Sequence, residues 1–347
     1  MKKADRHQQA IRDIQSVRSK NLQPAQLATE LLSGNRAVLS QCITLTESSA
    51  AADRNKAQQI LSIVQSHAGK SIRIGISGVP GAGKSTFIEA FGVWLCEKGH
   101  RVAVLAVDPS SETGKGSILG DKTRMNELAA RKDAFIRPSP SSGNLGGVAR
   151  KTRESIYLCE AAGFDVILVE TVGVGQNETA VHSMVDVFVL ISVAGTGDEL
   201  QGIKRGITEL ADLVLVNKAD GNNLPMAKAA RQDMSRAFHL MPEKASGWTA
   251  QAQLCSALEK TGLSEAWEQI RKFQEHTLAN GYFEKHRLDQ LKYWLHDYLR
   301  EELWNRFLQH PDVANQFEFT SDQVSSLELP VATAAEMLLT LYNKSRD

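Results

Sequence analysis

Residues 78–85 have the residue types and the spacing of a phosphate-binding loop. They read Gly-Val-Pro-Gly-Ala-Gly-Lys-Ser and fit the pattern G-x-x-x-x-G-K-[ST]. Glycines let the backbone wrap closely around phosphates, lysine supplies a positive charge for the β and γ phosphates, and the serine hydroxyl is placed to hold Mg²⁺. We expect the following residues to contact a nucleotide and its Mg²⁺ here: Gly78, Pro80, Gly81, Ala82, Gly83, Lys84, Ser85 and Thr86.

A second motif is of the kind that selects the base. Asn217, Lys218 and Asp220 form the pattern N-K-x-D directly after an apolar run. The carboxylate of Asp220 can accept both guanine N1–H and the exocyclic amine, a pair of donors that adenine does not offer. Further along, the segment Ser256, Ala257 and Leu258 is similar to loops whose backbone N–H groups meet guanine O6. The motifs therefore predict binding of GTP and GDP.

Acidic residues are expected near the γ phosphate, because hydrolysis requires Mg²⁺. Glu170 begins the pattern E-x-x-G, whose Gly173 would donate its amide to the γ phosphate. Asp108 follows an apolar run, and Asp121 lies in a polar, glycine-rich segment. Together with Ser85 these carboxylates form a set of hard oxygen ligands, direct or through water, although capping of strand ends and loop solvation are the alternative roles. We predict Lys84, Glu170 and Gly173 as the catalytic residues.

A residue to position the attacking water is not evident. Val174 follows Gly173, where many small GTPases have glutamine, and Gln176 is the nearest substitute. We therefore expect slow intrinsic turnover, on the order of 10⁻⁴ to 10⁻² per second. This rate is typical of a switch rather than of a metabolic catalyst.

The nucleotide motifs lie in a region of alternating strand and helix patterns. Short β-branched runs predict strands at residues 72–77, 102–107, 166–170, 187–193 and 213–217. Helices are predicted at 85–98, 147–162, 199–210 and 226–240. The pattern indicates a doubly wound α/β fold with a mostly parallel sheet, a P-loop GTPase domain over residues 70–275. Helical extensions are expected at residues 1–69 and 276–347.

Each extension has its own apolar pattern. Residues 27–32 and 39–43 have helical spacing on either side of a turn at Ser33, Gly34 and Asn35. In the second extension, one helix is predicted from His286 to Leu308, stopped by Pro311, and another at 332–342. The first of these has a leucine stripe widened by aromatic residues, which either packs onto its own domain or forms a dimer arm.

Composition excludes several classes of protein. The 40 basic and 40 acidic residues cancel, so no bulk attraction to nucleic acid or to an anionic membrane is expected. Apolar stretches such as residues 187–194 are too short to span a bilayer, and the charged start lacks a secretory signal pattern, so we expect a cytoplasmic protein without integral membrane association. The 4 cysteines are scattered and predict buried, reduced thiols.

The motifs taken in order resemble one family. GVPGAGKST, VDPSSETGKGSILGDKTRM, ETVGVGQNE and VNKAD are similar to the ArgK/MeaB family of P-loop GTPases associated with methylmalonyl-CoA mutase. The resemblance covers nearly the whole chain, including GNRAVLSQCITLTES from Gly34. Lys115 departs from the family pattern, in which we expect glycine.

This resemblance implies several properties of the chain. It places the Mg²⁺ ligands at Ser85, Asp108, Asp121 and Glu170, and the guanine contacts at Asn217, Lys218, Asp220 and residues 256–258. It also implies a homodimer through the C-terminal arm, and an additional nucleotide-sensing switch at residues 193–204. The implied role is that of a GTP-driven chaperone, which loads or protects the adenosylcobalamin cofactor of methylmalonyl-CoA mutase.

Two other functions remain open at this point. One is a kinase or ATPase that serves arginine and ornithine transport, against which the N-K-x-D motif argues. The other is a GTPase that inserts metal ions into enzymes, against which the lack of a His/Cys cluster in the sequence argues.

Overall fold

The structure, a computed structural model, describes residues 22–107, 125–138, 145–171, 177–195 and 205–344 of the 347 residues. The described residues up to Gln290 form one compact unit, and those from Leu291 onward form a second.

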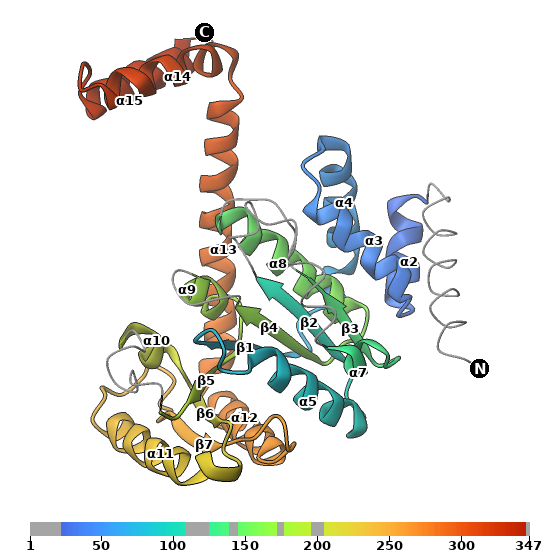
Figure 1. Cartoon of the computed structure of the whole chain (residues 1–347). Helices are drawn as coiled ribbons and strands as arrows, with labels where there is room; N and C mark the ends of the chain where they lie inside the picture. Colours follow the sequence, from blue (N-terminus) through green and yellow to red (C-terminus); the bar gives the residue numbers. More distant parts are fainter. Residues whose placement is uncertain (1–21, 108–124, 139–144, 172–176, 196–204, 345–347) are drawn as a thin grey trace. The chain divides into compact units, whose positions relative to one another are not determined.

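The first unit is built on a seven-stranded parallel sheet with the strand order β3-β2-β4-β1-β5-β6-β7, which can be followed across Figure 1. The strands are β1 Ile72–Gly78, β2 Val102–Val107, β3 Ala134–Arg137, β4 Val166–Thr171, β5 Val187–Val193, β6 Leu213–Asn217 and β7 Gln251–Leu254. The five predicted strands and the doubly wound α/β fold are confirmed. The short strands β3 and β7, which flank the sheet, were not predicted.

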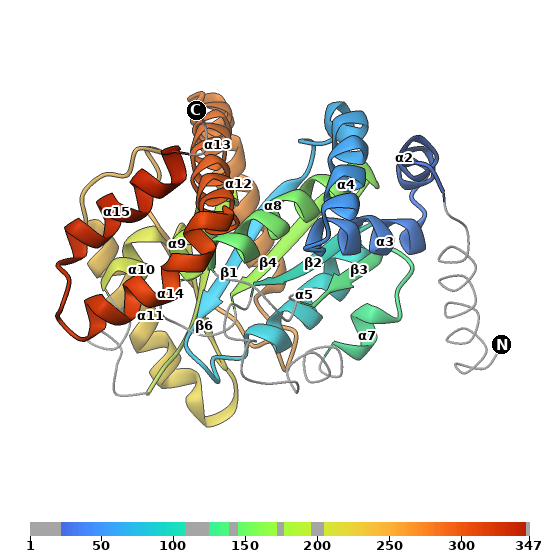
Figure 2. The same cartoon turned by 90° about the horizontal axis from the view of Figure 1, so that it is seen from above.

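Helices cover both faces of this sheet because successive side chains of a strand point to opposite faces. On one face, the alternate residues Ile72, Ile74 and Ile76 join a buried apolar cluster with α5 (Lys84–Glu97) and α12 (Leu263–Ala279). The opposite face is covered by α8 (Leu145–Ala161) and α9 (Asn177–His182) (Figure 2). The central strand is therefore buried on both sides, as its β-branched sequence predicts.

Helix α9 packs directly on β1 at Gly75. A Cβ atom at this glycine would lie 3.1 Å from the side chain of Val181 and 3.0 Å from that of Val185. These distances are tighter than most real Cβ contacts, so the glycine permits the close approach of the helix to the strand.

The N-terminal helices are α2 (Pro24–Leu32), α3 (Arg36–Glu47) and α4 (Ala51–Val64). The predicted turn between the first two is confirmed. Gly34 has the left-handed φ of 82°, and the side chain of Asn35 caps α3 by accepting hydrogen bonds from the N–H groups of Ala37 and Val38. Both α3 and α4 pack against α8, so these helices belong to the first unit.

The other helices agree in part with the sequence. The remaining described elements are η1 Gln65–His67, α7 Asn126–Ala129, α10 Arg205–Leu210, η3 Gly221–Asn223, α11 Leu224–His239, α13 Tyr282–Leu308, α14 Pro311–Ser325 and α15 Val331–Lys344. The prediction that a helix begins at His286 was wrong, because the helix starts four residues earlier, at Tyr282. Pro311 does not only end a helix: it occupies the first turn of α14, where its missing N–H has no helical partner to lose.

A buried ion-pair network lies at the amino ends of the central strands. Arg73 of β1 pairs with Glu160 of α8 at 2.8 Å, and Arg287 of α13 pairs with Asp186 at 2.7 Å. Arg287 also donates to the backbone carbonyls of Gly69 and Ser71. The first turns of α13 are therefore fixed to the nucleotide-binding unit.

The second unit has a small core of its own. Phe307, Val313 and Leu338 from α13, α14 and α15 form its buried cluster. Five leucines of the predicted stripe are exposed, of which Leu288 lies in the first unit and Leu291, Leu295, Leu299 and Leu303 lie in the second. Within the described parts of the chain, no helix is both long enough and apolar enough to cross a bilayer.

Candidate nucleotide-binding site

The loop after β1 is shaped by glycines. Gly78, Gly81 and Gly83 have φ values of 153°, 79° and 89°, which L side chains rarely adopt. A Cβ at Gly78 would lie 2.3 Å from the carbonyl oxygen of Ile191 in β5, so only glycine fits beside that backbone. Ala82 is buried, whereas Pro80 and Thr86 are exposed. The turn thus leads from the carboxyl end of the sheet into the start of α5.

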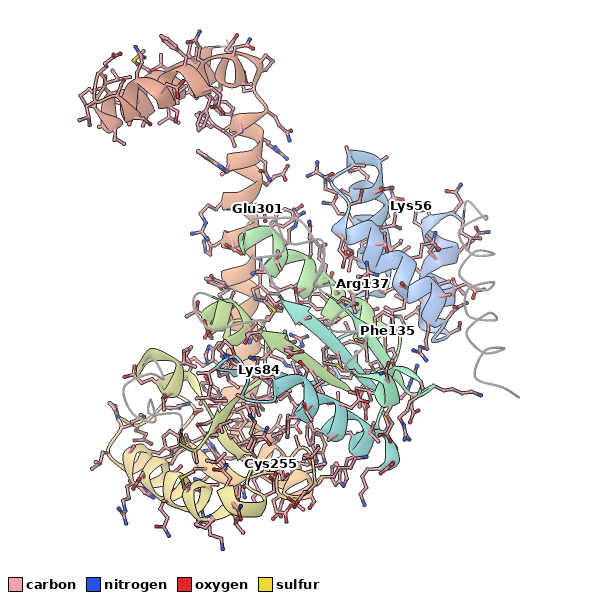
Figure 3. All side chains as sticks on the ribbon, viewed as in Figure 1. Lys56, Lys84, Phe135, Arg137, Cys255 and Glu301 are labelled. Carbon is pink, nitrogen blue, oxygen red and sulfur yellow. The ribbon has the colours of Figure 1, made fainter. Side chains whose placement is uncertain are left out.

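Lys84 lies in the first turn of α5, where this loop enters the helix (Figure 3). Its ammonium donates a 2.7 Å hydrogen bond to the carbonyl of Gly78, and the side chain is thereby folded over the loop. Burial lowers the pKa of Lys84, while the carboxylates of Glu170 and Glu178 act in the opposite direction. The ammonium of Lys84 can exchange its hydrogen bond to the Gly78 carbonyl for contacts with phosphate oxygens.

Ser85 and Glu170 are brought together from two elements. The hydroxyl of Ser85 in α5 donates to a carboxylate oxygen of Glu170 at 3.1 Å, and Glu170 is buried at the end of β4. A hydroxyl and a carboxylate are hard oxygen donors, so this pair fits Mg²⁺. The other predicted ligands, Asp108 and Asp121, lie outside the described residues, as does Gly173. Among the described side chains, no group of three or more His, Cys, Asp or Glu residues could hold a metal ion.

Asn217 joins the phosphate loop to the base-binding segments. Its amide nitrogen donates to the carbonyl of Ala82 at 2.8 Å, and its amide oxygen accepts from the N–H of Ala257 at 3.0 Å. The side chain is buried at the end of β6, so both bonds are shielded from water. One residue therefore sets the distance between the loop around the phosphates and the loop expected to meet guanine.

Asp220 is held by the third predicted segment. The hydroxyl of Ser256 donates a hydrogen bond to its carboxylate and accepts one from the N–H of Glu259. Paired backbone hydrogen bonds between Ser256 and Thr261 close the loop after β7. These contacts hold the carboxylate of Asp220 in one orientation.

The flanking residues of these segments differ in exposure. Lys218 is exposed and has an unusual positive φ of 57°, and Leu258 is 80% exposed. Ala257 is buried, and burial raises the pKa of the neighbouring Cys255 thiol to about 12, so the thiol stays protonated.

Two features of the site were missed in the sequence. Asn217 connects two loops through hydrogen bonds to Ala82 and Ala257, which lie 135 and 40 positions away in the sequence. No local sequence pattern reveals such contacts. Glu178 lies within the quoted ETVGVGQNE segment, and its position in that motif was the available signal, although no role was assigned to it.

Comparison with known proteins agrees with this geometry. Residues 39–312 match the family described as "Methylmalonyl Co-A mutase-associated GTPase MeaB". A probable GTPase of Mycobacterium tuberculosis (strain ATCC 25618 / H37Rv) is 49% identical over 317 residues, which cover 91% of this chain and 94% of the relative. The GTPase ArgK of Escherichia coli (strain K12) is 45% identical over 314 residues, covering 90% of this chain and 95% of ArgK. A crystal structure described as a LAO/AO transport system kinase has a TM-score of 0.72 and 38% identity, covering 92% of this chain and 97% of the other.

Proposed function

The chain belongs to the MeaB family of methylmalonyl Co-A mutase-associated GTPases, and from this premise we propose that it is a GTP-driven chaperone of that mutase. In this role it binds methylmalonyl-CoA mutase and assists the loading or the protection of its adenosylcobalamin cofactor. GTP hydrolysis then serves to change the affinity between the two proteins.

The observation that carries the nucleotide part of the proposal is the pair of contacts made by Asn217. They join the loop with Lys84 to the segments with Asp220 and Ser256, so one nucleotide can span both. Lys84 would contact the β and γ phosphates, and Asp220 would accept the two guanine donors. When bound, Mg²⁺ would neutralise charge on the phosphates, with Ser85 and Glu170 among its ligands.

Intrinsic turnover should be slow, and the mutase should accelerate it. The proposed additional switch comprises residues 193–204, of which the structure describes the first three. A partner that stabilises the transition state more than bound GTP raises kcat, and nucleotide must in turn change affinity for the partner if the partner changes nucleotide binding.

Steady-state GTPase assays with and without purified mutase test this proposal. Alanine at Asp198 or Lys204 should leave GTP binding nearly intact and abolish the stimulation. A mutase that neither binds the wild-type protein nor stimulates its GTPase activity would refute the chaperone role.

The exposed leucines of α13 support a homodimer. Leu291, Leu295, Leu299 and Leu303 are 45 to 60% exposed in the single chain and recur every four residues along the helix. Such a row forms an exposed apolar surface, which would be buried from water if two copies of the chain associated through it. Light scattering should give a dimer for the full chain at micromolar concentration.

A truncated chain tests the location of the dimer interface. The cut belongs after Gln290, because Arg287 makes the buried pair with Asp186 and must stay with the first unit. A protein ending at Gln290 should be monomeric and should still bind GTP. A full-length protein that is monomeric at micromolar concentration would refute the dimer arm.

The second candidate is a kinase or ATPase linked to transport, which the description of the similar crystal structure favours. The carboxylate of Asp220, held by Ser256, favours guanine instead, because adenine lacks the two donors. Titration with GTP and ATP separates the two functions, and preferential ATP binding would support the kinase.

A further inference from the structure

Two neighbouring strands of the sheet part from each other beside the candidate site. β1 and β4 run side by side in Figure 1, and the last residues in register between them are Ile76 and Glu170. On its other edge, β1 stays paired with β5 as far as Gly78, and β4 stays paired with β2 as far as Thr171. The backbone pairing between β1 and β4 therefore stops before either strand ends.

A side-chain hydrogen bond joins the same two strands one residue further on. The hydroxyl of Thr171 donates to that of Ser77 at 2.9 Å, and the carbonyl of Ile76 lies 3.5 Å from the same threonine oxygen. Ser77 and Thr171 are both completely buried, with exposed fractions of 0%. A buried hydroxyl costs free energy unless it is hydrogen-bonded. The two hydroxyls therefore satisfy each other at the point where the backbone pairing has ended.

The residues next to this hydroxyl pair are those expected to hold phosphate and Mg²⁺. Ser77 directly precedes Gly78, the first residue of the phosphate loop. Thr171 directly follows Glu170, whose carboxylate accepts the hydrogen bond of Ser85. Because successive side chains of a strand point to opposite faces of the sheet, Thr171 points away from the face on which Glu170 meets Ser85. The hydroxyl pair can therefore act on the site through the backbone, without contact to a ligand.

We propose that Ser77 and Thr171 are positioning residues, whose hydrogen bond fixes Glu170 relative to Ser85 for the binding of Mg²⁺. The inference rests on the proposed nucleotide and Mg²⁺ site. The bond joins the end of β4 to the end of β1 and limits how far the two ends can move apart. Mg²⁺ requires nearly ideal octahedral geometry, so a small change in the separation of two ligands weakens its binding.

Substitutions on both sides of the bond test this role. Thr171→Val keeps the shape of the side chain and replaces the hydroxyl by a methyl group, whereas Thr171→Ser keeps the hydroxyl and is the conservative variant. Ser77→Ala removes the other hydroxyl, so it carries the test even if Thr171→Val does not fold. Thr277 of α12 provides the matched control, because it is also 0% exposed and its hydroxyl donates to the carbonyl of Phe273 at 2.8 Å. Thr277→Val removes a buried hydroxyl of the same kind outside the candidate site.

The experiment is titration of Mg²⁺ into the full chain bound to a non-hydrolysable GTP analogue, with the affinity for the analogue measured separately in EDTA. Thr171→Val and Ser77→Ala should each weaken Mg²⁺ binding about tenfold, as is typical when a partner that orients a metal ligand is lost. The double variant should weaken it no more than either substitution alone, because both remove the same bond. The affinity for the analogue in EDTA should stay at the wild-type value. Thr171→Ser and Thr277→Val should bind Mg²⁺ as the wild type does.

Three results would overturn the inference. Wild-type Mg²⁺ affinity in Thr171→Val and Ser77→Ala excludes the positioning role, and losses that add up in the double variant show two independent effects. An equal loss of analogue affinity in EDTA shows general damage to the phosphate loop instead. The wild type tests the underlying site separately: if Mg²⁺ does not tighten its binding of the analogue, the proposed Mg²⁺ site itself is wrong.

Discussion

A substitution at Gly83 tests whether the phosphate loop and the base-binding segments stabilise each other. Gly83 has a φ of 89°, and a Cβ at this position would lie 2.6 Å from the amide nitrogen of Asn217. Gly81 in the same loop has a similar φ of 79°, but no atom of the described residues lies within 4 Å of its Cβ position. Gly83→Ala and Gly81→Ala therefore share the backbone strain, and only the first disturbs Asn217.

The expected magnitudes follow from these contacts. Alanine in the left-handed region costs about 1 kcal/mol, and both variants share this cost together with any gain from a less flexible unfolded chain. In Gly83→Ala, the Asn217 amide must move, which weakens its bonds to Ala82 and Ala257, each contributing about 1 kcal/mol. The difference between the two variants should thus be about 2 kcal/mol, or about 30-fold in the unfolding equilibrium.

Urea unfolding of the nucleotide-free proteins, followed by circular dichroism, measures this difference. The same pair of variants is compared in an Asn217→Ala background, where Gly83→Ala has no amide to displace and should cost no more than Gly81→Ala. If Gly83→Ala costs the same as Gly81→Ala with Asn217 present, or if its extra cost persists without Asn217, the proposed linkage is wrong.

Three further predictions concern the base site, the buried ion pair and the thiols. Asp220→Asn should lower GTP affinity at least about tenfold and shift the preference toward XTP, because the amide can donate to the xanthine 2-oxo group. Titration with both nucleotides measures this change. Unchanged GTP affinity would show that Asp220 does not contact the base. Arg287→Ala should destabilise the protein by about 3 to 5 kcal/mol in urea unfolding, because the buried Asp186 loses its ion-pair partner. By contrast, Arg236→Ala at the exposed pair with Asp233 should cost under about 1 kcal/mol. All four thiols are buried, and burial raises the pKa of Cys42 to about 12 and that of Cys96 to about 11. None of the four should therefore react with Ellman's reagent at pH 8 until the chain is unfolded. Rapid reaction of the native protein would contradict their burial.

The strands were predictable where burial on both faces selects β-branched residues. Such runs form β1, β2, β4, β5 and β6. β7 reads Gln-Ala-Gln-Leu and has no β-branched residue, so its extended form depends on pairing with β6 rather than on local preference. β3 is also only four residues long, and among the described strands it pairs only with β2. Tertiary pairing, which a sequence pattern does not show, decides both.

The helices that were missed had different causes. α12 has buried residues at Leu263, Ala266, Ile270 and Phe273, a helical spacing that the sequence does contain. α14 was overlooked because Pro311 was taken only as a stop, although proline is also favoured in a first turn. The first signal was available, whereas the second required knowing on which side of the proline a helix lies.

In the candidate site, too, the sequence predicted the residue types but not all of the contacts between them. Ser85 and Glu170 were predicted as neighbours from their motifs, since both chemistries are needed at one Mg²⁺ ion, and the structure brings the two side chains within hydrogen-bonding distance. No motif states that Lys84 donates to Gly78 and Ser85 to Glu170. A nucleotide bound as proposed would replace these contacts of both residues. Its net affinity would be the difference between the new and the lost interactions, so the motifs indicate which ligand the site would take, whereas the contacts around them would set how tightly it is held.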